Sequence, residues 1–546
     1  MTKTKIEALQ KTEVELTEKL VEDSRKTDKM EEMSATDAPA NNAAIDSVTS
    51  VMSCDELMER ILSLLYCRDL KSAVEVCKRW NTIGEGTTLW KWVKLRVTEG
   101  NLTNMPVILG SRLAKVEEII LDKAISKEVL LTIEKHQGLN VLRVSECNVS
   151  DIDSDLLVRV ITGIEEVSLE YTKLDAKQWN AIFNSTKGAK LKKLSIIAYE
   201  MVLPPDNPQL LAEAVSTLEK VKLTCGLTTE QSKAMFDHLA VKSNLKSLEI
   251  MCTDFSSVAV QTLAMVVSQV EEADLYFSRL TIQQIRAIFN KATEEVSKLK
   301  VLNLRLIKNL FQVDPDVMAT AVNKLEKVGL SCASLNATQC SAIFGLAAGK
   351  SKIKDLDISS NDLSSVNKHN MARAVNNMEK IDLRWTELTN QQCIQIIEYA
   401  EDEINLKVLK IGHNDLRAVE PGSMARAVIK MEECSLKCSK LTNQQAEDII
   451  RHINEDCKLK KLDMFTVNLS SLEADIIAKA IDNLGEVDLS YIRLNTVQLE
   501  AIFMVIRRGS KIKILKLRRE NLLSVQTETL VGRLLAWRKW NCPTTC

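Results

Sequence analysis

Apolar and polar residues follow one short pattern along most of the chain, L-x-x-L-x-L, which recurs about every 26 residues. Its two clearest copies are IKDLDISSNDL at residues 353–363 and LKVLKIGHNDL at residues 406–416. The alternation of apolar and polar residues within L-x-L predicts a short β-strand with one buried face. A helical stretch follows each predicted strand, so the pattern predicts a solenoid built from strand-and-helix units.

The central buried positions of these strands form two interleaved series, which together predict sixteen strands. The first series contains Leu142, Leu194, Leu248, Leu302, Leu356, Leu409, Leu462 and Leu515. The second series contains Ile119, Val167, Val221, Ala273, Val328, Ile381, Cys434 and Val487. No single unit can bury its apolar face alone, so we expect stability to be shared between neighbouring units.

A second pattern marks helix starts, with Leu followed by a small polar residue and, three residues after that, by Gln. Its seven copies begin at Leu174, Leu227, Leu280, Leu335, Leu388, Leu441 and Leu494, which are 53 or 55 residues apart. The small polar residue and the Gln predict a capping box, in which each side chain bonds the backbone N–H of the other residue. The preceding Leu stands where a hydrophobic staple packs.

A longer period of about 107 residues lies within the array and corresponds to four repeats. Pro208, Pro315 and Pro421 follow this period, and each is expected at the start of a helix, where a missing N–H costs nothing. Two residues past L-x-L of the second series, aromatic residues and cysteines alternate. These residues are Tyr171, Cys225, Phe277, Cys332, Trp385, Cys438 and Tyr491. Tandem duplication of a four-repeat unit explains both observations.

These patterns resemble a leucine-rich-repeat array of the ribonuclease-inhibitor type. The resemblance covers roughly residues 100–540 and implies an α/β horseshoe solenoid, with parallel strands inside and helices outside. We therefore expect a repeat domain at residues 98–546, with about sixteen repeats and a C-terminal cap that contains Trp537 and Trp540. Residues 1–50 are polar and predict a tail and linker, partly helical or disordered; a coiled-coil dimer is the alternative.

Composition narrows the expected partners and the expected compartment. The net charge is −2 over 546 residues, which gives no reason to expect a nucleic-acid or membrane partner. No apolar stretch approaches the length of a membrane span, and the N-terminus lacks the apolar core of a secretory signal. Several of the 14 cysteines take repeat positions that suit a small apolar residue, which favours reduced thiols and a cytoplasmic or nuclear protein.

Residues 51–97 predict three short helices ahead of the repeats. Ser53 and Glu56 form a capping box, and an apolar stripe at helical spacing follows from Leu57 to Leu65. Asp69 and Thr88 can cap the second and third helices, and Gly84 and Gly86 separate these two. By itself this pattern also suits a helical cap on the solenoid, which would need the same apolar residues for its own core.

The segment resembles an F-box, through DELMERILSLL, RDL, VCKRW at residues 76–80 and LW at residues 89–90. It departs from the family at Ser53 and Cys54, where Leu-Pro is usual, which puts the affinity for the adaptor in question. An F-box docks on the Skp-type adaptor of a cullin–RING ubiquitin ligase. The residues that the resemblance places at adaptor contacts are Leu57, Ile61, Leu62, Leu65, Val76, Cys77 and Trp90.

Strand residues that face out of the sheet are expected to line the concave surface and to meet a protein partner. Acidic and basic residues are nearly balanced there, unlike a nucleic-acid track, which is one-sidedly basic. Central acids could attract a basic segment, but neighbouring cations offset much of that field. For the aromatic series, packing beneath the loops is the favoured interpretation and a binding hot spot is the alternative. The candidate substrate-binding residues are Tyr276, Phe277, Asp357, Asp382, Arg384 and Trp385.

No motif predicts catalysis, a metal site or a cofactor. The five histidines are scattered, and GLAAGKS at residues 345–351 follows a helix rather than the strand that a phosphate loop requires. An F-box followed by a repeat horseshoe implies a non-catalytic substrate-recognition subunit of a Skp-cullin-F-box ubiquitin ligase, with an unknown protein substrate. The alternative is a leucine-rich-repeat scaffold or inhibitor that serves no ligase.

The strand pattern makes one direct prediction about stability. Leu356 is a central residue of the first series, so Leu356→Ala removes buried apolar volume and should lower the free energy of unfolding by about 2–5 kcal/mol. Chemical denaturation measures this change. An unchanged midpoint would show that Leu356 lies outside the core.

Overall fold

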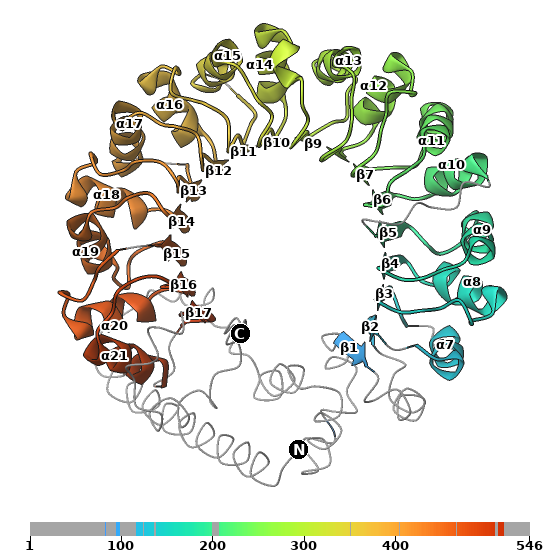
Figure 1. Ribbon diagram of the computed structural model, residues 1–546, viewed down its shortest axis with the longest axis horizontal. Coiled ribbons are helices and arrows are strands. Elements are labelled where there is room, and N and C mark those ends of the chain that lie inside the picture. Colours follow the sequence, from blue (N-terminus) through green and yellow to red (C-terminus); the bar gives the residue numbers. More distant parts are fainter. Residues whose placement is uncertain are drawn as a thin grey trace, which may run out of the picture. The chain divides into compact units, whose positions relative to one another are not determined.

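The fold is described from a computed structural model (Figure 1). It describes residues 82, 94–98, 116–123, 125–135, 138–198, 207–349, 351–402, 405–465, 467–507 and 511–517. The chain divides into two compact units, residues 1–198 and residues 199–546, and each is considered by itself. The predicted tail at residues 1–50 and the predicted cap residues Trp537 and Trp540 lie outside the described residues.

The first unit is a parallel sheet covered by helices. Its strands are β1 (Lys94–Val97), β2 (Glu118–Asp122), β3 (Val141–Ser145), β4 (Glu166–Glu170) and β5 (Lys193–Ile197). Its helices are α7 (Lys127–Glu134), α8 (Ser154–Thr162) and α9 (Ala176–Asn184). Strand β1 pairs in parallel with β2 and was not among the sixteen predicted strands. The described array therefore starts upstream of residue 98, where the repeat domain was predicted to begin.

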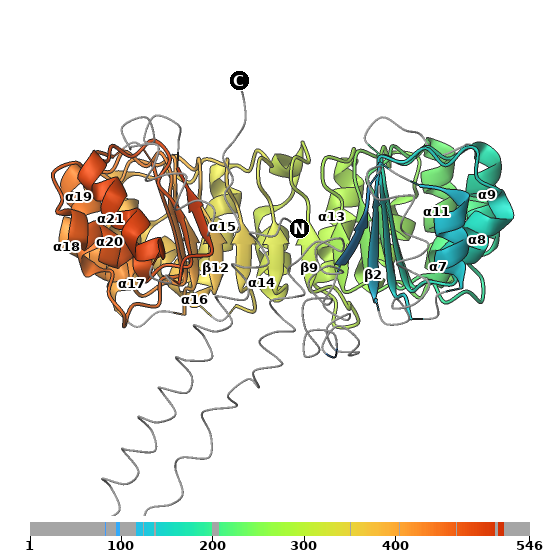
Figure 2. The ribbon, with the colours of Figure 1, turned by 90° about the horizontal axis from the view of Figure 1, so that it is seen from below.

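The second unit continues the same alternation of strand and helix. Its strands are β6 (Lys220–Leu223), β7 (Ser247–Ile250), β8 (Glu272–Asp274), β9 (Val301–Asn303), β10 (Lys327–Gly329), β11 (Asp355–Asp357), β12 (Lys380–Asp382), β13 (Val408–Lys410), β14 (Glu433–Leu436), β15 (Lys461–Met464), β16 (Glu486–Asp488) and β17 (Ile514–Lys516). Each pairs in parallel with the next. Figures 1 and 2 show these strands side by side on the inner face of the unit.

The helices of the second unit lie on its outer face (Figure 1). They are α10 (Pro208–Thr217), α11 (Thr229–Val241), α12 (Val260–Gln269), α13 (Ile282–Ala292), α14 (Pro315–Lys324), α15 (Ala337–Ala347), α16 (Lys368–Asn377), α17 (Asn390–Glu401), α18 (Pro421–Val428), α19 (Asn443–His452), α20 (Ala474–Asp482) and α21 (Thr496–Arg507). A short 3-10 helix, η2 (Leu310–Gln312), precedes α14. Pro208, Pro315 and Pro421 stand at helix starts, as predicted. Both units are thus solenoids of the leucine-rich-repeat type.

The two predicted series of central residues form one row within each unit. Leu356 of β11 is opposite Val328 on one side and opposite Ile381 on the other, and the remaining pairs keep this register. All of these side chains are buried, which confirms the predicted core. Leu therefore alternates along the row with Val, Ile, Ala or Cys, and neighbouring strands present side chains of different shape to the helices that cover them.

Lysine and glutamate alternate at the amino-terminal edge of the sheet in every repeat from Glu165 to Lys460. Here lysines of one repeat series pair with glutamates of the other, one strand away. The pairs are Lys192–Glu165 in the first unit and Lys246–Glu219, Lys300–Glu271, Lys407–Glu379 and Lys460–Glu432 in the second. These pairs are exposed, and such pairs contribute at most about 1 kcal/mol each. Their regular order favours native strand pairing, because a strand that paired with its next-but-one neighbour would bring like charges together.

The seven predicted capping boxes are all present. The buried glutamine of most boxes also makes a contact that the sequence pattern did not suggest. Its side-chain amide donates to two backbone carbonyls in the preceding repeat. Glutamines that do so are Gln178, Gln284, Gln339, Gln392, Gln445 and Gln498.

Gln392 illustrates the arrangement. Its Oε1 accepts from the backbone N–H of Thr389 at 2.8 Å. Its Nε2 donates to the carbonyls of Leu363 and Val366 at 2.8 and 2.7 Å. One side chain thus caps its own helix and bonds the turn that starts the previous helix.

No described helix has the length and apolar character that a bilayer crossing requires.

Two neighbouring glutamines in α17 allow a matched test of this contact. Gln392→Met leaves the buried carbonyl of Val366 and the cap N–H of Thr389 without partners, and the carbonyl of Leu363 keeps only the N–H of Val366. The variant should therefore lower the free energy of unfolding by about 2–4 kcal/mol. Gln391→Met alters an exposed side chain of the same helix, and Met and Gln have similar helix propensities. The control should therefore change stability by less than about 0.5 kcal/mol. Equal denaturation midpoints for the two variants would disprove the proposed role of Gln392.

Candidate partner-binding surface

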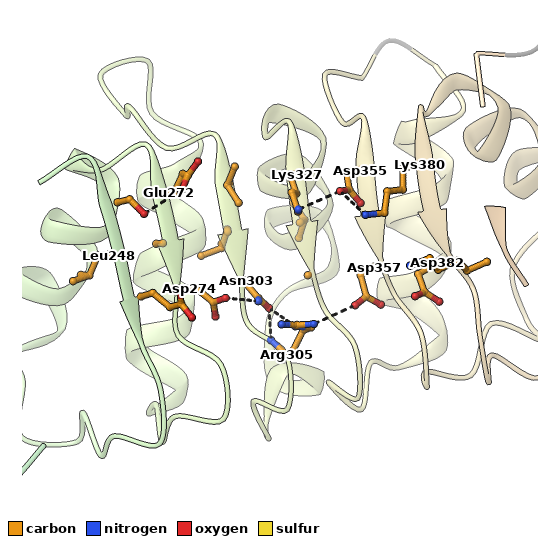
Figure 3. Close-up of a pocket in the computed structure, with 18 of the residues that line it drawn as sticks. Leu248, Glu272, Asp274, Asn303, Arg305, Lys327, Asp355, Asp357, Lys380 and Asp382 are labelled. Atoms are coloured by element: carbon orange, nitrogen blue, oxygen red, sulfur yellow. Dashed lines mark hydrogen bonds and ion pairs between the residues drawn. The ribbon is translucent and has the colours of Figure 1, made fainter. Parts of the chain in front are cut away.

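The inner face of the second unit has a hollow of about 370 Å³ that spans strands β6 to β13 (Figure 3). Its lining contains charged residues of both signs, among them Asp274, Arg305, Lys327, Asp355 and Asp382. These side chains alternate along each strand with the buried central residues, so they necessarily face away from the helices. The surface is therefore built by the same pattern that builds the core.

Most of the charges in this hollow are paired with one another. Lys327 and Lys380 both contact Asp355, at 3.3 and 3.4 Å. Arg384 holds Asp382 with two hydrogen bonds, from Nε to Oδ1 at 2.9 Å and from Nη2 to Oδ2 at 2.6 Å. Pairing of this kind leaves only a weak net field, so the predicted attraction for a basic segment has little support from the charges themselves.

The central row of acids also relies on hydrogen bonds. Asp274 accepts from the amide of Asn303 at 2.7 Å, and burial raises the pKa of its carboxyl group. Arg305 lies 4.0 Å from Asp357. Gly329 is opposite Asn303, whose side-chain oxygen would lie 2.6 Å from any Cβ at that position. A glycine at this point makes room for the Asn303 side chain within the row.

The carboxyl-terminal edge of the sheet carries the predicted aromatic series. Trp385, Phe277 and Tyr491 of the second unit have exposed fractions of 59%, 57% and 43%, and Tyr171 of the first unit has 48%. The interpretation favoured on sequence, packing beneath the loops, is therefore wrong for these four rings. The loops leave them uncovered because each residue has a positive φ, between 50° and 64°, which turns its side chain out of the sheet.

Trp385 is held in place by the backbone around it. Its N–H donates to the carbonyl of Gly412 at 3.3 Å. Buried Asn414 donates to the carbonyl of Leu383 and accepts from the N–H of Leu388, which fixes the turn on both sides of Trp385. A Cβ at Gly412 would clash with the carbonyl of Lys437, so the close approach of these two repeats requires glycine.

Each ring of the aromatic series in the second unit has a second ring beside it. Trp385 stacks on His413, with ring centroids 3.7 Å apart and planes 13° apart. Burial lowers the pKa of His413, and the positive charges of Lys437 and Arg384 add to this effect. The centroid of Phe277 lies 6.2 Å from that of Tyr276, and the centroid of Tyr491 lies 4.8 Å from that of Phe465.

Comparison with known proteins bears on the segment that precedes the repeats in the sequence. Residues 55–96 match the family model described as F-box-like. The chain thus carries an F-box-like segment followed by a repeat solenoid. A search of solved structures matches the crystal structure of the Rad7 and Elc1 complex in yeast. That match has a TM-score of 0.37 and 14% identity, and it covers 81% of this chain and 93% of the other. No curated protein matches the chain.

The F-box-like segment overlaps the solenoid. The family match begins just after Ser53 and Cys54, where the sequence departs from the family, and it ends within strand β1. No linker residues therefore separate the match from the sheet. The residues at adaptor-contact positions, Leu57, Ile61, Leu62, Leu65, Val76, Cys77 and Trp90, lie outside the described residues.

The candidate substrate-binding residues all lie on the inner face or its carboxyl-terminal edge. The structure brings Arg384 together with Asp382 and Tyr276 together with Phe277, and it places Asp357 beside Arg305. Sequence reasoning missed His413, Lys437 and Phe465 as neighbours of the aromatic series. An alignment of all strands would have found them, because each lies one or two residues after the L-x-L of its own repeat.

The described surface offers binding chemistry. Its charged groups are largely paired with one another and its rings are exposed, whereas several cysteines of the second unit lie in the core. Burial raises the pKa of Cys225, Cys340 and Cys393 to about 12, so these thiols stay protonated and unreactive. Within the described ranges, no three His, Cys, Asp or Glu side chains form a group that could hold a metal ion.

Exposure of Trp385 has a measurable consequence. Trp385→Asn removes an uncovered ring from a left-handed backbone position that Asn tolerates well, so the free energy of unfolding should change by less than about 1 kcal/mol. Phe344→Ala in α15 removes a fully buried ring and should cost about 3–5 kcal/mol. Denaturant titration compares the two. A large loss in the Trp385 variant would mean that the ring supports the core.

Proposed function

We propose that the chain is the substrate-recognition subunit of a Skp-cullin-F-box ubiquitin ligase. The F-box-like segment docks on a Skp-type adaptor, and the inner face of the repeats binds a protein substrate. The observation that carries this proposal is the order of the two parts, an F-box-like match at residues 55–96 that leads directly into a leucine-rich-repeat solenoid. The protein itself performs no chemistry in this role.

Such a subunit acts by position. Binding to the adaptor and to the substrate at once raises the effective concentration of substrate lysines near the charged ubiquitin carrier. The family match shares residues 94–96 with strand β1, so the two parts adjoin in the sequence.

Adaptor binding separates this proposal from a repeat scaffold or inhibitor that serves no ligase. The full chain should capture purified Skp-type adaptor, and Leu57→Ala/Ile61→Ala/Trp90→Ala should weaken capture at least about tenfold, because a few buried apolar residues dominate such interfaces. Capture and cooperative unfolding are measured on the same preparations. The control, Trp385→Ser on the repeat edge, should capture adaptor as the wild type does.

Failure of the folded wild-type chain to capture adaptor would overturn the ligase role. In that case the departure at Ser53 and Cys54 explains the loss, and the scaffold function takes precedence.

A further inference from the structure

The carboxyl-terminal edge of the second unit carries three groups of similar composition. We call each group a station, and each consists of two rings and one cation. Station 1 contains Tyr276, Phe277 and Arg305, station 2 contains Trp385, His413 and Arg384, and station 3 contains Phe465, Tyr491 and Lys437. Arg305 lies 5.2 Å from the ring centroid of Tyr276, and Lys437 lies 4.2 Å from that of Phe465.

The spacing of the stations is regular. Their most exposed rings, Phe277, Trp385 and Tyr491, directly follow strands β8, β12 and β16, so four strand intervals separate each from the next. At about 4.8 Å per interval the rings are about 19 Å apart along the edge. At the midpoint between them the same repeat position holds Cys332 or Cys438, which are small residues.

The fold gains little from these exposed rings. Each has a positive φ, which is unfavourable for a residue other than glycine, and each leaves much of its apolar surface in water. Asn or Gly would suit the backbone better. Large rings at strained, uncovered positions are typical of residues that contact a partner.

Charge favours one kind of partner. Arg305 and Lys437 lie over rings of stations 1 and 3, so basic side chains of a partner would be repelled there, whereas Arg384 of station 2 is paired with Asp382. The acids of the central row are engaged by Arg384, Asn303, Lys222 and Arg305. Apolar anchors with acidic residues between them fit both the rings and the cations.

We infer that the second unit binds one extended, acidic protein segment that places an apolar side chain on each of the three stations. An extended chain rises about 3.3 Å per residue, so 19 Å corresponds to about six residues. Six is even, and side chains an even number of residues apart lie on the same face of a strand. A helix would need about 13 residues for this distance and would turn its anchors to different faces.

This inference rests on the proposed function in that the segment would belong to the substrate. It also makes a specific demand on that substrate, namely apolar residues at positions i, i+6 and i+12. Because the demand concerns only the repeats, it can be tested on the full chain without adaptor.

Selection from a library of random 16-residue peptides displayed on phage tests the inference. Enriched peptides should show the i, i+6, i+12 spacing with acidic residues between the anchors. Their synthetic forms should bind Phe277→Ser/Trp385→Ser/Tyr491→Ser at least about tenfold more weakly than wild type, and Trp385→Ser alone should lose less. The control Val241→Ser/Leu346→Ser/Val497→Ser changes exposed apolar residues of the outer helices and should bind within about twofold of wild type.

Three outcomes would overturn the inference: enriched peptides without this spacing, peptides that bind the triple station variant as well as wild type, and no enrichment at all. Adaptor capture is measured on the same preparations. Loss of adaptor binding with intact peptide binding would remove the ligase role and leave the stations. Intact adaptor binding without peptide binding would remove the stations and leave the ligase role.

Discussion

A buried glutamine amide shared between two repeats is the interaction on which the rest of the array depends. In Gln392 one side chain caps its own helix and bonds the carbonyls of Leu363 and Val366 in the preceding repeat. Backbone groups buried at such a boundary would otherwise each cost about 1–3 kcal/mol. Because the contact recurs every second repeat, it ties the repeats into pairs and sets the distance between successive helix starts.

This constraint also shapes the binding surface. Fixed helix starts fix the loops that lead into them, and those loops begin at the positive-φ residues of the carboxyl-terminal edge. Asn361 and Asn414 act in the same way on the strand side, since each bonds carbonyls of its own repeat and of the preceding one. Trp385 thus owes its position to groups that are themselves buried and polar. The core and caps provide stability, so the side chains at the edge are free to serve binding.

The sequence predicted the fold well because its strongest constraints are local and periodic. The central strand residues, the prolines at helix starts and the capping boxes each follow from spacing alone, and the structure confirms them. Strand β1 was missed because KLRV lies inside the segment that resembles an F-box. The second role of Gln392 was missed because a capping box is defined within one helix, whereas its other partners lie 26 and 29 residues away.

The surface was harder to predict, since exposure depends on backbone direction rather than on residue type. Cys225 and Trp385 occupy equivalent positions in the sequence pattern, yet Cys225 is fully buried and Trp385 is exposed. Trp385 has a positive φ and Cys225 does not, and a period in the sequence cannot distinguish the two conformations. The same period is nevertheless what places rings four strands apart. Duplication of a four-repeat unit therefore explains how an array selected for a uniform core came to present Phe277, Trp385 and Tyr491 at equivalent positions of one edge. A partner that uses all three rings gains from their fixed separation.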